Sequence, residues 1–261
     1  MLTKKTSDLA HHTKSFGDFT ESAYRDLICT AKKNWQFIQF PDHAQAGRTI
    51  LWRHDVDFSL HRALALAKIE REEGVRATYF ILLTGSFYNP LEKETAQIVR
   101  SIADMGHAIG LHFDPVYYGE SFSSREDLER ALIFEGEIVE KLSGTRPKVF
   151  SWHNPTSGDW LTMKEEIVAG MLNAYCGVIG TRYRYVSDSN GIWRHDRLQD
   201  VLKDSTIESL QVLTHPAWWV PEPLAPRERI QRTVNGRARR TMERYDEDLK
   251  RFSRPNIDGE K

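Results

Sequence analysis

The sequence predicts a single-domain α/β fold in which a parallel sheet closes into a barrel and helices pack around it. Short apolar segments rich in β-branched and aromatic residues alternate with amphipathic helical segments along most of the chain. This order is typical of βα units whose strands run parallel. The length of 261 residues suits one α/β barrel. A hydrophobic fraction of 40% supplies enough apolar surface for its core.

Hydrophobic periodicity and helix-end signals give the elements in order. The expected strands are 50–57, 75–83, 107–113, 148–153, 174–179, 182–186 and 207–214. The expected helices are 18–33, 59–73, 91–105, a segment from Ser123 to about Gly144, 159–168, 197–203 and a long C-terminal helix. Ser123 and Glu126 match a capping box. We therefore expect a flexible N-terminus over 1–17, the barrel over 18–225, and a C-terminal helix over 226–261 that packs on or extends from the barrel.

The charge balance argues against nucleic acid or an anionic membrane as a partner, because the numbers of basic and acidic residues, 36 and 37, are nearly equal. The basic run 227–240 is expected to be a solvated helix face, with a docking patch for a nucleotide or lipid phosphate as the alternative. Cys29 and Cys176 lie in no disulfide or metal-binding pattern. Since the N-terminus carries no apolar signal region and no apolar run is long enough to span a bilayer, we expect a cytoplasmic protein.

Acids and imidazoles end four of the expected strands. These groups are Asp55 and Asp57, His112 and Asp114, His153, and His215. Functional residues of (β/α) barrels lie at the C-terminal ends of the strands, so we expect the groups to converge. Asp55 and Asp57 point the same way along one strand, with Cα atoms ~7 Å apart. One carboxylate can then bind a cation while the other acts as a base.

The ligand types in this set narrow the choice of metal. Imidazole and carboxylate without thiolate suit Zn²⁺, and also Co²⁺, Ni²⁺, Mn²⁺ or Fe²⁺. Three protein ligands with an open position are typical of a catalytic site. The sequence therefore predicts one divalent ion, with zinc as the first candidate.

Four segments resemble the polysaccharide deacetylase, or NodB-homology, family (carbohydrate esterase family four). They are Arg-His-Asp-Val-Asp at 53–57, Ala-Thr-Tyr-Phe-Ile at 77–81, Gly-His-Ala-Ile-Gly-Leu-His at 106–112, and Leu-Thr-His-Pro at 213–216. The resemblance covers about residues 50–219. It implies an irregular seven-stranded NodB-like barrel of the TIM type. It also implies that Asp55 is the general base, that Asp57 and His112 bind the metal, and that His215 is the catalytic acid.

The sequence departs from the family pattern at two places. Val116 stands where the second histidine of the family's metal motif is expected. We therefore expect His153 to be the third ligand, with Asp114 as the alternative. The arginine that orients the base is absent from its usual motif, and Arg53 or Arg194 is expected to replace it. These departures indicate a divergent branch, like members associated with bacterial surface-polysaccharide synthesis.

The expected substrate-binding residues gather near the same strand ends. They are Trp152, Asn154, Asp188, Trp193, Arg194 and Trp218. Asp188 and Trp193 lie in a segment similar to the family's Asp–Trp motif, which supports the catalytic histidine and lines the pocket. Tryptophan rings can stack on sugars, and ordinary core packing is the alternative for each.

The resemblance implies a metal-dependent hydrolase that removes an N-acyl group, acetyl in the first place, from an amino sugar. The expected partner is a carbohydrate or a nucleotide- or lipid-linked sugar, and the oligomeric state stays open. One alternative is a deformylase or another hydrolase of non-peptide C–N bonds on the same barrel. A second is an inactive carbohydrate-binding homologue.

Overall fold

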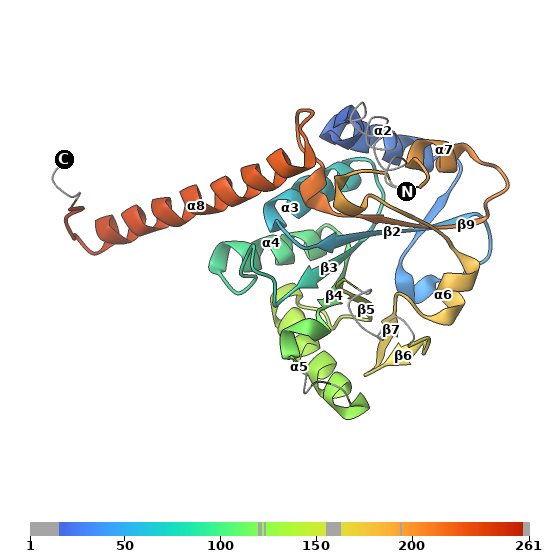
Figure 1. Ribbon diagram of the computed structural model, residues 1–261, viewed down its shortest axis with the longest axis horizontal. Coiled ribbons are helices and arrows are strands. Elements are labelled where there is room, and N and C mark those ends of the chain that lie inside the picture. The colour runs from blue at the N-terminus through green and yellow to red at the C-terminus, as the bar shows by residue number, and fades with distance from the viewer. Residues whose placement is uncertain (1–15, 120–121, 123, 155–162, 194, 258–261) are drawn as a thin grey trace, which may run out of the picture.

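The computed structural model describes residues 16–119, 122, 124–154, 163–193 and 195–257, and shows a parallel sheet with helices packed around it (Figure 1). The strands are β1 (Gln36–Ile38), β2 (Thr49–Val56), β3 (Thr78–Leu82), β4 (Ala108–Phe113), β5 (Val149–Trp152), β6 (Ile167–Val168), β7 (Met171–Asn173), β8 (Arg184–Ser187) and β9 (Ser209–Thr214). Their order in the sheet is β6-β7-β5-β4-β3-β2-β9-β8, and β1 pairs with the first half of β2.

The sheet is an open, irregular barrel. Among the described residues, seven strands from β7 to β8 form one continuous parallel run, and only the short β6 pairs antiparallel. Within the described part of the chain, the edge strands β6 and β8 do not pair with each other. The expected irregular (β/α) barrel is therefore confirmed as a curled, mainly parallel sheet with helices, although over the residues that the structure describes the sheet does not close and it contains nine strands.

The central strand β2 is covered on both faces, and this position is the reason why its residues are extended and buried. All eight of its residues are buried, as expected for a parallel strand that is covered on both faces. The face that carries His54 points toward the helices. There, His54 Nε2 lies 2.7 Å from Glu70 of the first covering helix, and the same carboxylate accepts hydrogen bonds from Tyr24 and Tyr79. The opposite face carries Arg53 and Asp55.

Most of the helices follow a strand and pack on the sheet, whereas α2 (Glu21–Ala31) precedes β1 and α8 (Pro226–Arg251) extends away from the body (Figure 1). The other helices are α3 (Leu60–Glu72), α4 (Lys93–Asp104), α5 (Arg125–Ser143), α6 (Gly177–Arg182) and α7 (Leu198–Lys203). Helix α2 contacts α3, α3 contacts α4, and α4 contacts α5. Ser59 caps α3 by accepting a hydrogen bond from the backbone of Arg62. Gly144 ends α5 in the left-handed conformation.

Several expected elements differ from the structure. The capping box of α5 is formed by Ser124 and Asp127, one residue later than expected, and Ser123 lies outside the described residues. The expected helix 159–168 is wrong where it is described, because 167–168 form β6. Ala169 and Gly170, both with positive φ, make the two-residue turn that joins β6 to β7.

The expected strand 174–179 is also wrong. The backbone N–H of Gly180 donates to Cys176 O at 2.9 Å and starts helix α6. The β-branched side chains in this segment favour a strand only where a neighbouring strand is available, because β-propensity depends on context. Strand β1 was not expected from the sequence, because a segment of three residues is too short to show a hydrophobic periodicity.

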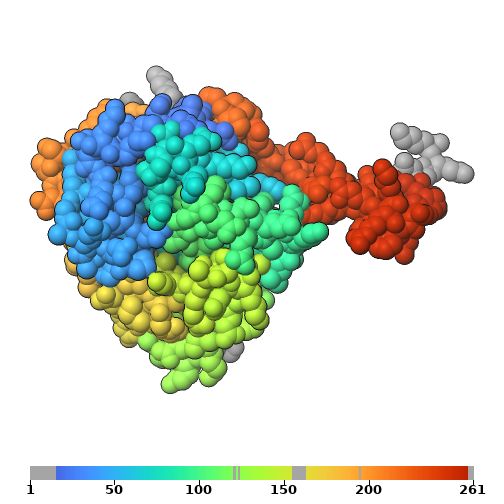
Figure 2. Space-filling view, turned by 180° about the vertical axis from the view of Figure 1, so that it is seen from behind, coloured from blue at the N-terminus to red at the C-terminus, as the bar shows by residue number. Residues whose placement is uncertain are grey.

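Helix α8 leaves the body of the molecule and extends well beyond it (Figures 1 and 2). Its inner side is held by ion pairs from Arg237, Arg240 and Arg244 to Glu92 and Glu94 at the start of α4. The basic run is thus partly neutralised by carboxylates of the same chain. None of the helices in the described residues is long and apolar enough to cross a membrane.

Candidate active site

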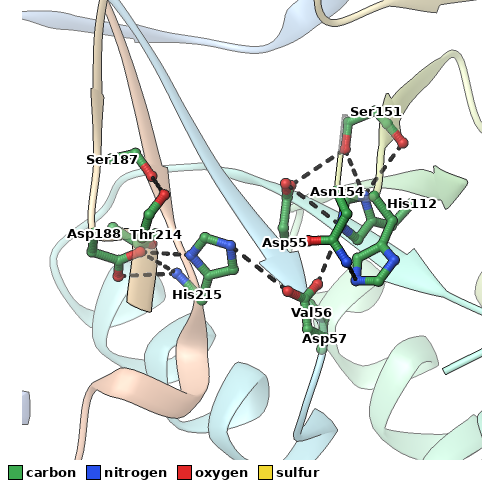
Figure 3. Close-up of polar contacts among 12 residues, drawn as sticks. Asp55, Val56, Asp57, His112, Ser151, Asn154, Ser187, Asp188, Thr214 and His215 are labelled. Carbon is green, nitrogen blue, oxygen red and sulfur yellow. Dashed lines mark hydrogen bonds and ion pairs between the residues drawn. The ribbon is translucent and has the colours of Figure 1, made fainter. Parts of the chain in front are cut away.

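Four strand ends at one edge of the sheet carry the acids and imidazoles of the site, most of which are labelled in Figure 3. Asp55 and Asp57 come from the end of β2, and His112 from β4. His153 follows β5, and His215 follows β9. Because β2 pairs with β9 on one side and with β3 and then β4 on the other, the parallel register brings these ends to one edge. The structure therefore brings together side chains that are up to 160 residues apart.

A buried arginine holds Asp55. The guanidinium of Arg53, two residues earlier on the same face of β2, donates a hydrogen bond to Asp55 Oδ2 at 2.8 Å. It donates a second to the hydroxyl of Tyr175 at 2.9 Å and lies over the rings of Phe80 and Tyr175. Arg53 is fully buried and Asp55 is 2% exposed. Of the two arginines expected to orient Asp55, Arg53 is thus in place, whereas Arg194 lies outside the described residues.

The Asp188 carboxylate, whose charge is opposite to that of a protonated imidazole, holds the His215 ring in place. The Nδ1 atom of His215 lies 2.6 Å from Asp188 Oδ1, and the backbone N–H of His215 donates to the same carboxylate at 3.0 Å. The indole of Trp219 donates to the other oxygen at 2.9 Å. Burial alone would lower the pKa of His215, but the charge and hydrogen bond of Asp188, followed by Asp57, raise this pKa to about 9. The free Nε2 atom points toward Asp57, 3.7 Å from its Oδ2 (Figure 3).

Asp57 and His112 are arranged like two ligands of one metal ion. Asp57 Oδ1 lies 3.2 Å from His112 Nε2, and this buried oxygen accepts no hydrogen bond of ordinary geometry. Two ligands ~2.1 Å from a tetrahedral ion would be ~3.4 Å apart, so the separation fits a divalent cation. Burial alone would raise the pKa of Asp57, but the contact and charge of His112, and then of His215, hold it well below its usual range.

The other nitrogen of His112 is fixed by Ser151. Its Nδ1 lies 2.8 Å from the hydroxyl of Ser151 and 3.3 Å from the carbonyl of the same residue. The Ser151 hydroxyl is also 3.4 Å from Asp55 Oδ1. A contact of this kind sets which nitrogen faces a metal. Burial would lower the pKa of His112, but the charges of Asp55 and Asp57 raise it.

The third expected ligand does not reach the same point. His153 Nδ1 lies 3.1 Å from Asp114 Oδ2, and His153 Nε2 is 3.2 Å from the amide nitrogen of Asn154. The rings of His112 and His153 are 5.3 Å apart between centroids. Among the residues that the structure describes, no three His, Cys, Asp or Glu side chains are close enough to hold a metal ion. Two of the expected ligands therefore fit a divalent ion, and the third would have to turn toward it.

The expected sugar-stacking tryptophans are packed inside the molecule. Trp152 is 1% exposed and makes edge contacts with Phe113 and Phe150. Trp193, 5% exposed, stacks on Phe19. Neighbouring aromatic rings cover both, as expected for the alternative of ordinary core packing. Trp218 is also buried, beside Phe58. Asn154, by contrast, is exposed at the end of β5, next to His153.

Ser151 and Tyr175 belong to the site and were not expected from the sequence. Ser151 precedes a tryptophan in an apolar strand, and Tyr175 lies in a segment that was expected to be a strand. Neither stands in a motif. Strand alternation could have found Ser151, because it shares a face with His153 two residues on. Tyr175 could not have been found, because its contact with Arg53 depends on the path of the chain after β7.

Comparisons with known proteins give a likeness to solved structures. No protein-family model and no curated protein matches the chain. It is similar to the catalytic domain of a peptidoglycan N-acetylglucosamine deacetylase from Eubacterium rectale, with 14% identity, a TM-score of 0.46 and coverage of 74% of this chain and 86% of that one. It is also similar to the Bacillus subtilis peptidoglycan deacetylase PdaC, with 13% identity, a TM-score of 0.43 and coverage of 79% and 96%.

A third similar structure is a CE4 family pseudoenzyme from Bacillus anthracis, with 12% identity, a TM-score of 0.41 and coverage of 74% of this chain. The chain spans 61% of the length of that protein. Likenesses of this degree do not carry an activity over to the chain.

Proposed function

We propose that this chain is a metal-dependent hydrolase that removes an N-acyl group, acetyl in the first place, from an amino sugar. One observation carries the proposal: Asp55 and His215 flank Asp57, and each is held by a buried group of opposite charge. Arg53 keeps the Asp55 carboxylate oriented, and Asp188 keeps Nε2 of His215 directed into the site. A base and an acid fixed on either side of one point suit the hydrolysis of an amide.

The roles follow from the bonds that change. Asp55 takes a proton from water as the water oxygen attacks the acyl carbon. His215, protonated at neutral pH because Asp188 raises its pKa to about 9, gives a proton to the departing nitrogen as the C–N bond breaks. The products are a carboxylate and an amine. Each proton transfer typically contributes ~10²–10⁴-fold to the rate.

Asp57 and His112 would hold the metal, with His153 as the third ligand after its ring turns and Asp114 as the alternative. A bound divalent ion lowers the pKa of its water and polarises the acyl oxygen. Zinc is the first candidate for a site of imidazole and carboxylate, and Co²⁺, Ni²⁺, Mn²⁺ and Fe²⁺ suit the same donors. The buried Asp57 Oδ1 contacts His112 Nε2 at 3.2 Å without a hydrogen bond of ordinary geometry. This supports the assignment, because a buried acceptor without a hydrogen bond is costly unless something else binds it.

A carbohydrate substrate is proposed from the resemblance of the strand-end motifs to the polysaccharide deacetylases. A second function is favoured by one observation: the third ligand is turned toward Asp114, which would suit an inactive carbohydrate-binding homologue.

The test is product release from a panel of free, oligomeric and nucleotide-linked N-acetyl amino sugars, with N-formyl analogues beside them, after loading with Zn²⁺ or Co²⁺. We expect acetate release that Asp55→Asn abolishes and that metal removal abolishes. Formate release alone would assign the deformylase instead. Carbohydrate binding with neither product nor metal uptake would assign the inactive homologue and overturn the proposal.

A further inference from the structure

The outer face of α8 carries an apolar stripe. Val234, Ala238, Met242, Tyr245 and Leu249 follow one another at steps of three or four residues, so they lie on one side of the helix. Val234, Met242 and Tyr245 are 43%, 59% and 53% exposed. The arginines that bind Glu92 and Glu94 occupy a different side, which faces the body.

The outer half of the helix lacks support from its own body. Arg244 makes the outermost ion pair between α8 and the body in the described part of the chain, and beyond it the helix extends into solvent (Figure 1). Most helices in proteins are stabilised by tertiary packing of an apolar face rather than by intrinsic propensity. Exposed apolar side chains along one side of a helix, such as Val234, Met242 and Tyr245, are typical of an interaction site.

The charges of α8 favour a second copy of this chain as the partner. Residues 227–240 contain six arginines and one glutamate, whereas residues 243–248 contain four acids and one arginine. Arg229 is buried, and Arg237 and Arg240 bind Glu92 and Glu94, but Arg239 stays exposed beside the stripe. A second copy of the same helix, running antiparallel, would place its acidic segment beside the basic segment of the first. A parallel arrangement would place acid beside acid. We infer that two copies of this chain associate through an antiparallel pair of α8 helices.

The pairing can be written residue by residue. In an antiparallel pair with its two-fold axis between Thr241 and Met242, Leu249 of one copy lies opposite Val234 of the other. Tyr245 then lies opposite Ala238, so that a large side chain meets a small one. Arg239, whose side chain is 79% exposed, lies on the same flank of the stripe as Asp246 of the second copy. An isologous two-fold contact needs this kind of self-complementary surface, and opposite charges across it fix the orientation.

The first experiment is the oligomeric state of the full chain by sedimentation equilibrium over 1–50 µM. We expect a dimer whose dissociation constant rises at least tenfold in Val234→Glu. Val178→Glu is the matched control, because Val178 is a similarly exposed valine, 46%, on α6; we expect it to leave the dimer unchanged. A wild-type chain that stays monomeric at 50 µM, or equal effects of the two variants, would overturn the inference.

The second experiment tests the orientation and does not depend on the first variant folding well. Val234→Cys and Leu249→Cys are made separately in chains that also carry Cys29→Ser, and are oxidised alone and mixed. We expect a cross-linked dimer in the mixture and little in either variant alone. Efficient cross-linking of Val234→Cys with itself would indicate parallel helices and contradict the inference. Hydrolase activity plays no part in either readout, so the proposed function stands or falls separately.

Discussion

Asp188 and His215 form the most strongly connected pair of the site: one buried carboxylate accepts both the ring N–H and the backbone N–H of the same histidine. The two residues follow neighbouring strands, β8 and β9. Two contacts to one residue fix both the position of the chain and the direction of the ring. The pair therefore determines which nitrogen of His215 faces Asp57.

Asp188→Asn is expected to lower the rate of amide hydrolysis by about 10²-fold or more, because the neutral amide no longer stabilises protonated His215. Since a raised pKa keeps the acid protonated up to about pH 9, its loss moves the alkaline limb of the pH–rate profile to lower pH. The measurement is kcat/KM from pH 5 to 10. Asp196→Asn, which removes an exposed ion pair with Arg184, is the control and should change neither rate nor profile.

His215→Ala is expected to slow amides much more than activated esters. An amine leaves only when it is protonated, whereas a phenolate leaves without help. Rates with an N-acetyl amino sugar and a nitrophenyl acetate give the comparison. Equal losses for both substrates would show that His215 does not act as the acid.

Much of this arrangement could be predicted from the sequence, since the information is local. Asp55 lies in, and Asp57 directly follows, a strand in which every residue is buried, and strand alternation alone puts them on one side. Arg53 shares that side for the same reason, and the structure places its guanidinium on Asp55. The (β/α) barrel could be predicted because strands and helices alternate along the chain, and hydrophobic periodicity detects this alternation well.

The rest depends on tertiary contacts that no local pattern records. Trp152 and Trp193 stand near strand ends in the sequence, yet rings from distant segments cover both. The segment 174–179 has strand-forming side chains, but it turns into α6. The direction of the His153 ring depends on Asp114 and Asn154, and a sequence gives residue types at strand ends without their rotamers.

The third metal ligand can be identified by comparing two variants. We expect His153→Ala to weaken Zn²⁺ or Co²⁺ binding at least tenfold, and Asp114→Asn to weaken it less, because Asp114 would orient the imidazole. Asp57→Asn and His112→Ala should abolish binding. Isothermal titration calorimetry measures each affinity independently of activity. A larger loss in Asp114→Asn than in His153→Ala would make Asp114 the ligand.

Arg53→Met is expected to lower the free energy of unfolding by about 3 kcal/mol or more, because removal of one partner leaves the other charge of a buried pair uncompensated. The rate should fall as well, since Asp55 loses the hydrogen bond that orients it. Arg53→Lys keeps the charge and should recover part of the stability but less of the rate. Urea unfolding and steady-state kinetics separate the two effects. Unchanged unfolding in Arg53→Met would rule out a role for the ion pair in stability.

Glu135 gives a prediction for stability against pH. This carboxyl on α5 is buried, accepts a hydrogen bond from Tyr118 at 2.6 Å, and leaves its second oxygen without a hydrogen bond. Burial raises its pKa to about 7. Because the pKa is higher in the folded state than in the unfolded state, the neutral carboxyl stabilises the fold at pH values below the pKa of the unfolded state. This stability is lost as the pH rises through about 7. The loss is roughly 3 kcal/mol at most.

Glu135→Gln keeps an oxygen for Tyr118 and removes the charge. We expect the variant to unfold at a higher urea concentration than the wild type at pH 8.5. At pH 4.5 we expect little advantage, because the carboxyl is neutral in the folded state and only about half ionised in the unfolded state. Glu137→Gln, on the exposed side of the same helix, controls for the loss of a surface charge. A constant difference between Glu135→Gln and wild type from pH 4.5 to 8.5 would show that Glu135 does not titrate in this range.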